Sequence, residues 1–348
     1  MAMLADLVDV VIGVDTHKHT HTAAVVVAAT GAVIAQATAA ATPAGYRQLL
    51  ALADHQPGQR MWAIEGTGGY GAGLTRFLTA HHERVVELDR PKRAARRHGA
   101  KSDPLDATRA AREALGRDQL AQPRAAGHRA ALQARLTTRR SAVQAGTDAQ
   151  RQLHALVVAA PDALRGRLRG LTTVRLVSTC ARLRQRADGD PETAATVASL
   201  RALARRIQLL DAEIAEHTRA ITALVRAWRP DLLTRTGVGP IVAAIVLCAW
   251  SHPGRCPTDA AFAMLGGAAP IPASSGQTVR VRLNRSGDRQ LNQALHLVVL
   301  TRLRYDPATR AYAQRRRAEG KTNREIRRCL VRYVARQLYR LLEAQPAL

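Results

Sequence analysis

Four carboxylates stand where catalytic metal ligands are commonly found. Asp15 and Glu65 each directly follow a short apolar segment, and Asp103 and Asp106 lie three residues apart where a helix is expected to begin. Gathered in one place, four carboxylates repel each other unless divalent cations neutralise them, and such hard oxygen ligands suit Mg²⁺ or Mn²⁺. These four residues therefore predict a metal site that cleaves phosphodiester bonds.

The pair at 103 and 106 has a second interpretation. Asp103 as the capping residue, Pro104 in the first helical position and Asp106 in the first turn are ordinary helix-start chemistry. Both interpretations stay open at this point.

Residues 66–71 satisfy the dinucleotide-binding spacing G-x-G-x-x-G, and Asp89 follows about twenty residues on. In that kind of site, however, the glycines follow the first strand of a β-α-β fold, whereas here a strand meander comes first. Glu65 would also place a negative charge beside the pyrophosphate. We therefore expect no bound nucleotide cofactor.

Three histidines alternate beside Asp15, at positions 17, 19 and 21. Alternation is typical of one face of a strand. We expect a solvent-facing strand edge rather than a set of metal ligands.

A second constellation lies near the end of the chain. Ser274 and Ser275 precede Gly276 in an expected loop, and Arg280 and Arg282 then share one face of a short strand, with Arg285 beyond. A loop serine that faces arginines can attack a DNA phosphate while the guanidinium groups stabilise the transition-state charge. The alternative is an ordinary Ser-Ser-Gly turn.

The elements around the acids predict a mixed sheet. A three-strand meander is expected within 8–40, then a helix at 44–53, a strand at 61–64, a helix near 74–81 and a strand at 85–88. Hairpins followed by β/α alternation match the ribonuclease-H-like order, so residues 1–125 are expected to form an α/β domain of the RNase H/RuvC type.

Residues 126–228 have a helical pattern and are expected to form a central coiled coil. From Leu200 to Trp228 apolar residues follow alternating steps of three and four, and an earlier stretch, 132–157, can pair with them across a break at 188–191. We expect this seam to join protomers into a homo-oligomer, a dimer or a tetramer.

Residues 229–348 are expected to be a helical C-terminal domain. Gly237 and Gly239 precede an apolar helix, as in a helix-hairpin-helix element whose backbone amides bind a DNA phosphate, although a plain helical hairpin looks similar. A basic amphipathic helix, 323–342, follows.

The composition favours a polyanionic partner. The 348 residues carry 52 Lys and Arg against 27 Asp and Glu, a net charge of +25. Biased base composition is an alternative source of part of the excess, because 48 of these residues are arginine. Aromatic residues make up 3% of the chain, which argues against a platform that stacks unpaired bases. Without a signal sequence, a membrane span or paired cysteines, a cytoplasmic protein with reduced cysteines is expected.

These motifs, in their order, resemble transposases of the insertion sequence 110 family. The resemblance is carried by residues 12–18, 65–70, 101–107, 237–240 and 274–276 and runs almost end to end. It implies a RuvC-like domain with a D-E-D-D set (Asp15, Glu65, Asp103, Asp106), a coiled coil, and a transposase domain with a catalytic serine. That serine is the one directly before Gly276, Ser275, with Ser274 as the lesser candidate.

The resemblance also implies partners. Double-stranded DNA, as element ends and target, would be the substrate of a bacterial, nucleoid-associated enzyme. A structured non-coding guide, the bridge RNA, would pair with donor and target DNA. The chain departs from the family at Gly267-Ala268-Ala269-Pro270, where Gly-Leu-x-Pro is usual, and at Leu291-Asn292, where Leu-Arg is usual.

We therefore expect a DNA recombinase that cleaves and rejoins strands through a phosphoserine intermediate. One alternative is a RuvC-like nuclease that hydrolyses DNA without a covalent intermediate. The other is an inactive nucleic-acid-binding scaffold.

Overall fold

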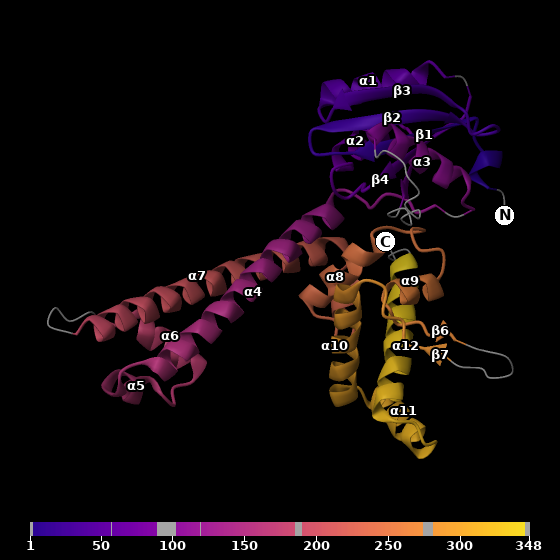
Figure 1. The fold of residues 1–348 in the computed structure, drawn as a ribbon. Helices are drawn as coiled ribbons and strands as arrows, with labels where there is room; N and C mark the ends of the chain where they lie inside the picture. The colour runs from indigo at the N-terminus through magenta and orange to yellow at the C-terminus, as the bar shows by residue number, and fades with distance from the viewer. Residues whose placement is uncertain are drawn as a thin grey trace. The chain divides into compact units, whose positions relative to one another are not determined.

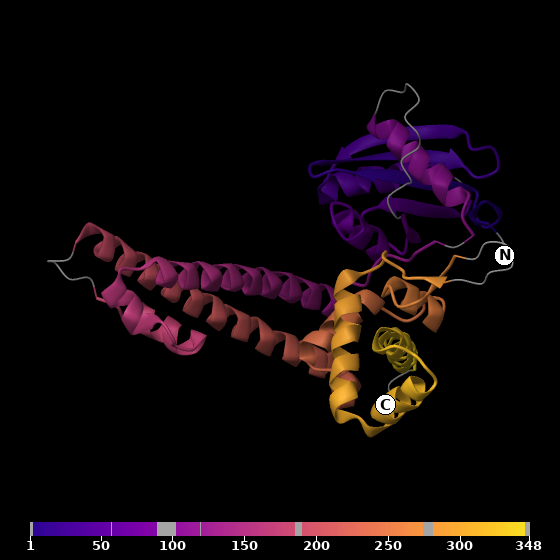
Figure 2. The same ribbon diagram turned by 60° about the horizontal axis from the view of Figure 1, so that its bottom comes forward.

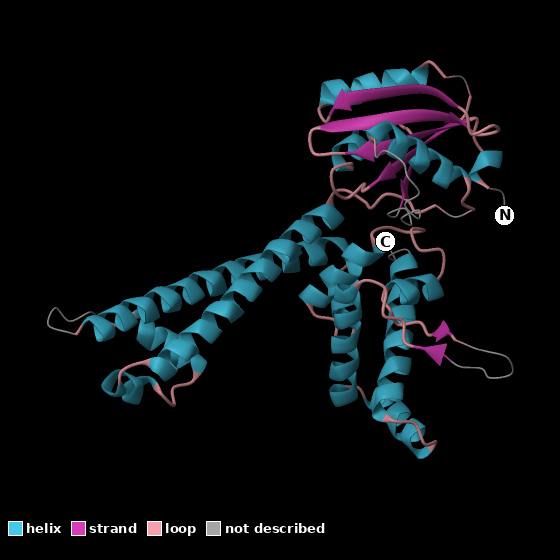
Figure 3. Cartoon of the chain, in the orientation of Figure 1, coloured by secondary structure: helices cyan, strands magenta, loops and turns pink. Residues whose placement is uncertain are grey.

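The computed structural model describes residues 3–56, 58–88, 102–118, 120–184, 190–273 and 281–344 (Figure 1). The chain forms two compact units, 1–126 and 127–348. The first is a mixed α/β unit and the second is almost entirely helical (Figure 3). Each unit is described by itself below.

The described residues of the first unit form a five-stranded sheet. Its strands are β1 (Val10–Thr16), β2 (Thr20–Val27), β3 (Val33–Ala40), β4 (Arg60–Glu65) and β5 (Val85–Leu88), in the spatial order β3-β2-β1-β4-β5. The pairs β1/β2 and β2/β3 are antiparallel, whereas β4 runs parallel to both β1 and β5. The predicted meander, the later β/α alternation and the mixed sheet are confirmed.

Helices cover both faces of this sheet because its central strands are apolar on both sides. Ile12 and Val14 pack in one core with α1 (Pro43–Asp54) and α2 (Ala72–Ala80). Val11 points to the opposite core, which α3 (Asp103–Leu115) covers (Figure 2). A short 3₁₀ turn, Leu4–Asp6, packs against the same face as α3.

Gly13 lets α3 lie directly against β1. A Cβ atom at this position would stand 2.1 Å from the carbonyl oxygen of Ala107 and 2.5 Å from the amide nitrogen of Ala111. Alanines at 107 and 111 present the smallest helix surface to the strand, and both are fully buried. Gln36 of β3 adds a hydrogen bond of 3.2 Å from its amide nitrogen to Thr108 Oγ1. The position of the helix across the sheet is therefore determined by backbone contact.

A long helix pair dominates one part of the second unit. α4 (His128–Ala159) packs along α7 (Pro191–Trp228), which begins where Asp190 accepts a hydrogen bond from the Thr193 amide. The heptad residues Leu200, Ile207 and Ile221 are buried within this unit. The seam thus finds its apolar partner inside the chain, so it does not by itself require a second protomer.

Two short helices, α5 (Asp162–Leu168) and α6 (Thr173–Ala181), connect α4 to α7. They pack at the end of the helix pair that lies far from α8 to α12 (Figure 1).

The remaining elements form a helical assembly with a small hairpin. They are η2 (Pro230–Thr234), α8 (Pro240–Trp250), α9 (Asp259–Leu265), β6 (Ile271–Pro272), β7 (Val281–Arg282), α10 (Arg289–Tyr305), α11 (Pro307–Ala318) and α12 (Asn323–Glu343). Leu132 of α4 and Ile221 of α7 belong to the same core as α8, so the helix pair and these elements form one compact unit. A domain boundary at 228 stays a prediction.

Arg229 connects the end of α7 to the end of α12. Its buried guanidinium donates to both carboxylate oxygens of Asp231 and to the carbonyls of Leu341 and Leu342. The four cysteines are unpaired. Among the described residues, no helix is both long and apolar enough to cross a bilayer.

The contact at Gly13 generates a stability prediction. Gly13→Ala inserts a Cβ into backbone atoms of α3, so it should destabilise the first unit by about 3 kcal/mol and lower its Tm by on the order of 10 °C. Differential scanning calorimetry of the full chain measures both. Gly116→Ala, at the end of the same helix, is the matched control, because its Cβ would meet only ordinary contacts at 3.7 Å. Equal melting temperatures for Gly13→Ala and the wild type would refute the packing argument.

Candidate active site

Two of the four predicted acids stand at the same edge of the sheet. Asp15 and Glu65 each follow the register pair Val14 and Ile64 of the parallel strands β1 and β4. Carboxyl ends of parallel strands are where α/β sheets place their ligands. Because side chains alternate along a strand, Glu65 shares the face of Ala63, which lies in the core under α3. Asp15 likewise shares the face of Gly13.

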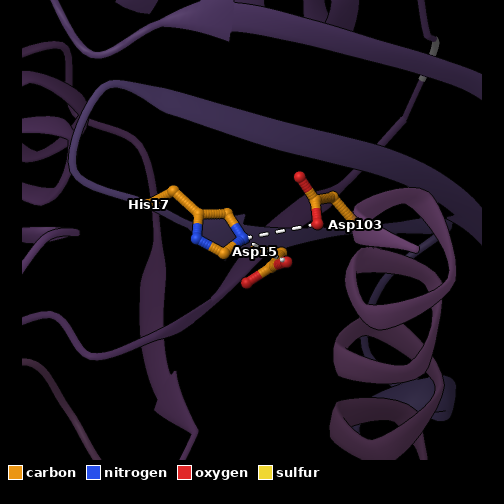
Figure 4. Close-up of side chains that lie close together, drawn as sticks. All are labelled: Asp15, His17 and Asp103. Carbon is orange, nitrogen blue, oxygen red and sulfur yellow. Dashed lines mark hydrogen bonds and ion pairs between the residues drawn. The ribbon is translucent and has the colours of Figure 1, made fainter. Parts of the chain in front are cut away.

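Asp103 reaches this edge from the first turn of α3. The Nε2 atom of His17 lies 3.2 Å from Asp15 Oδ2 and 3.4 Å from Asp103 Oδ1 (Figure 4). One ligand atom from each of the three side chains falls within 4.8 Å of the other two. Asp15 and Asp103, which are far apart in the sequence, thus converge at one point with His17, whereas Glu65 and Asp106 are not part of this group.

Asp106 follows one turn later on α3. Its carboxylate forms an ion pair of 2.9 Å with Arg109, and its side chain is about one-third exposed. Burial raises the pKa of the Asp15 carboxyl. The nearby His17 opposes this rise, and the charges of Asp103 and Asp106 add to it. The Asp103 and Asp106 charges are thus close enough to act on the Asp15 carboxyl.

This donor set fits a divalent cation. The carboxylates supply hard oxygen ligands, and the imidazole of His17 is a ligand that Mn²⁺ accepts more readily than Mg²⁺ does. Burial, and to a lesser extent the charges of Asp103 and Asp106, disfavour the charged form of Asp15, and a bound cation would stabilise that form. Asp15, Asp103 and His17 would contact it first, with Glu65 and Asp106 at the same edge.

The helix-start interpretation of Asp103 was wrong in one respect. Ser102 is the capping residue, and α3 begins at Asp103 itself. The Asp103 carboxylate instead contacts His17, which directly follows β1. A role in the site is therefore compatible with the way that the helix begins.

The predicted histidine edge was also wrong. β1 ends at Thr16 and β2 begins at Thr20, so His17 lies in the turn between them, beside the acids. His21 is fully buried and stacks on Tyr46 with ring centroids 5.7 Å apart; burial lowers its pKa. His17 and His19 are both exposed. The sequence analysis missed that His17 comes two residues after Asp15, where β1 has ended and the chain turns back. At that position its side chain lies beside the Asp15 carboxylate.

The glycine-rich loop uses several of its backbone amides for hydrogen bonds within the loop. The amides of Gly69 and Gly71 both donate to the carbonyl of Gly66, and that of Ala72 donates to Gly69. Gly66 adopts a φ of +70°, which favours glycine and allows the chain to turn directly after Glu65. Asp89 lies outside the described residues.

The serine segment belongs to the second unit. Ser274, Ser275, Gly276 and Arg280 lie outside the described residues. The chain on either side forms the antiparallel pair β6 and β7, in which Ile271 pairs with Arg282. The two ends of the segment are thus held next to each other.

A basic hollow of about 900 Å³ adjoins these strands. Its lining includes Pro270 and Arg282, one on each side of the segment, together with part of α12. Eight cationic side chains line it: Arg282, Arg285, Arg289, Lys321, Arg324, Arg327, Arg328 and Arg332. The contribution of α12 was missed in the sequence, although arginines at 324, 328 and 332 recur at the spacing that places them on one helix face.

Buried polar contacts fix the loop that carries Arg285. Asn284 accepts hydrogen bonds from the amide and the hydroxyl of Ser286, at 2.9 and 2.7 Å, and donates to the carbonyl of Met264. Asn292, where the family has arginine, donates to the carbonyl of Gly266 at 2.7 Å. The asparagine at 292 therefore stabilises the wall of the hollow through a hydrogen bond to the backbone beside it.

Gly237 and Gly239 have different environments. Gly237 has a φ of +85°, and a Cβ there would lie 3.0 Å from the Val298 carbonyl, so its first role is to let α10 pack closely. Gly239 precedes α8 in open space. A phosphate contact at this turn stays a prediction.

Comparison with known proteins identifies the family. Residues 12–160 match a family model described as a transposase, whose name carries the D-E-D-D set, and residues 230–314 match the transposase IS116/IS110/IS902 family. The first range contains all four acids, and the second contains both serine candidates.

Two insertion-element proteins are similar to the chain. An IS110 protein of 43.6 kDa from Streptomyces coelicolor is 34% identical over 36% of this chain and 33% of its own length. An IS900 protein of 42 kDa from Mycobacterium paratuberculosis is 28% identical over 82% of this chain and 83% of its own length. With both halves matched in order, the chain belongs to the IS110 family of transposases.

Proposed function

We propose that this transposase cleaves and rejoins double-stranded DNA, at element ends and target, with its carboxylate site and Ser275 acting on the phosphodiester bond. The observation that carries the proposal is the convergence of Asp15 and Asp103, within reach of His17, at the edge where Glu65 also ends its strand. Carboxylates this close repel each other without a cation, and with a bound divalent cation they form a site that can act on phosphodiester bonds.

Asp15, Glu65, Asp103 and Asp106 would hold Mg²⁺ or Mn²⁺. The bound ion would supply Lewis-acid stabilisation of the phosphate oxygens. The contribution of the chain is to hold the ligands in place: α3 cannot shift along β1 without moving Ala107 and Ala111 off Gly13. His17, as an additional contact in the turn, would orient the Asp15 and Asp103 carboxylates.

Ser275 would form the covalent link to DNA. Its Oγ would attack the phosphorus, a phosphoserine ester would form, and the bond to the leaving sugar oxygen would break. The serine would lose its proton and the departing oxygen would gain one. Because one phosphate ester replaces another, the free energy of the cleaved bond is conserved and no outside energy source is needed. The reverse attack by a new strand would reseal the DNA. Arg282 and Arg285, in the lining of the basic hollow, and Arg280 would stabilise the charged phosphate.

The family resemblance extends the proposal to partners. A structured non-coding RNA would guide the enzyme, and the net charge of +25 suits a complex with two polyanions. The helix pair α4/α7 would be the coiled coil of the family. A homo-oligomer, dimer or tetramer, would hold several DNA ends at once.

The metal site generates a binding prediction. Saturating Mn²⁺ should stabilise the wild type by about 2 kcal/mol or more, and Asp15→Asn should lose most of this gain, because an amide cannot supply the missing charge. Without metal, Asp15→Asn should melt no lower than the wild type, since it removes a crowded charge. Thermal unfolding with and without Mn²⁺ measures both, and Asp118→Asn, an exposed acid in the same unit, is the control. Equal Mn²⁺ stabilisation of both variants would contradict the site.

The same site generates an activity prediction. Asp106→Asn should reduce metal-dependent strand cleavage by about 100-fold or more, with an unchanged melting temperature in the absence of metal. Gel electrophoresis of labelled element-end DNA, with the guide RNA bound, is the assay. Activity of Asp106→Asn close to that of the wild type would remove this acid from the proposal. A wild type that binds DNA and never cleaves it would favour the scaffold alternative.

The nucleophile is tested by trapping the covalent product. On denaturing gels, Ser275→Ala should lose the protein-DNA adduct while it still binds DNA, and Ser274→Ala should keep it. Loss of the adduct in Ser274→Ala alone would move the nucleophile by one residue. Cleavage by the wild type without any adduct would favour the hydrolytic nuclease.

A further inference from the structure

The far end of the helix pair carries a dense group of arginines. We call residues 161–184, which hold α5 and α6, the arm tip (Figure 1). These 24 residues contain six arginines, a single acidic residue, Asp162, and no aromatic residue. The arm tip belongs neither to the carboxylate site nor to the basic hollow.

Apolar residues of the arm tip pack into a core of the second unit. Leu164 and Leu168 of α5 and Leu176 and Cys180 of α6 are buried in a core with Leu200 and Ile207 of α7. With one side of each short helix fixed on this core, the arginines face solvent. Arg167, Arg169, Arg175, Arg182 and Arg184 are exposed.

The charge at the arm tip has little compensation. Within this fully described segment, Arg165 pairs with Asp162, and no ion pair is seen for the five exposed arginines. The surface of α7 differs: its arginines are interspersed with Asp211, Glu213 and Glu216. A base-composition bias acts on both segments alike, so it does not explain why acids are missing from one of them.

The arm tip is well separated from the core around α8. Leu200 packs with the arm tip, whereas Ile221 packs with α8, and 21 residues of one helix span about 30 Å. That distance is close to one turn of a nucleic-acid duplex, about 34 Å. A duplex one turn long that begins at the surface around α8 would therefore extend to the arm tip.

We propose that the arm tip binds the phosphate backbone of a nucleic-acid duplex without reading its base sequence. This inference rests on the proposed function, which supplies the nucleic acid. Exposed guanidinium groups suit phosphates, whether they lie in the two short helices (Arg167, Arg175) or directly after them (Arg169, Arg182). Phosphate contacts position a protein without specifying sequence. Stacking on unpaired bases is not available, since the segment has no aromatic side chain. The duplex is either DNA or a paired stem of RNA, which share this backbone chemistry.

Salt dependence of binding is the test. The full-length protein is titrated against a DNA duplex and an RNA duplex of the same arbitrary sequence, between about 50 and 200 mM salt. The arm-tip variant replaces Arg167, Arg169, Arg175 and Arg182 with glutamine. Each lost phosphate contact lowers the slope of log K against log salt by about 0.9, so the variant's slope should fall by about 3 to 4 on at least one duplex. The duplex that responds identifies the partner.

A matched variant separates a defined surface from general charge. It replaces Arg205, Arg206, Arg219 and Arg226, four exposed arginines of α7, with glutamine. Its slope should change by less than about 1. Equal losses in the two variants, or no loss in the arm-tip variant while the wild type binds, would overturn the inference and leave the proposed function intact. A wild type that binds neither duplex would overturn both. Circular dichroism of each variant confirms an intact fold.

Discussion

The first unit depends on the backbone contact between α3 and β1. Gly13 has no side chain, so the helix approaches the strand until its own carbonyl and amide groups would touch a Cβ there. The acids at the start of α3 are brought to the end of β1 by this contact. A larger residue at 13 would push the helix outward and separate Asp103 from Asp15, although neither acid would change. A residue on which no chemistry acts thus controls the geometry of the chemistry.

The two units concentrate side chains of opposite charge. In the first, carboxylates are concentrated at a sheet edge until burial and mutual repulsion raise the pKa of Asp15. In the second, eight cationic side chains surround one hollow. Each arrangement is unfavourable by itself, because like charges repel. In the proposed function each would be relieved by a partner of opposite sign, a cation in the first unit and a phosphate in the second.

The periodicity of apolar residues and the position of turn residues predicted most of the fold. The meander, the β/α alternation and the basic helix at 323–342 follow from patterns within one segment, and each is confirmed. The acids at 15 and 103 were predicted to converge because strand ends and helix starts are recognisable locally. The misplaced features depend on tertiary context: His17 and His21 alternate in sequence, yet a turn separates them, and one is exposed beside acids while the other is buried against Tyr46. The partner of the heptad seam was likewise undetermined, since apolar spacing does not reveal whether α4 or a second protomer fills it.

The packing of α4 on α7 also constrains how this protein can change in length. Each residue added to a helix rotates the residues beyond it by about 100°. A single insertion between Ile207 and Ile221 of α7 would therefore rotate Leu200 and Ile207 away from α4. Because α5 and α6 pack on these residues, they would be displaced as well. Insertions of seven residues preserve the seam, provided that both helices gain them together. Members of a lineage with longer or shorter arms should therefore differ by paired heptads, and the two helices should lengthen or shorten as one.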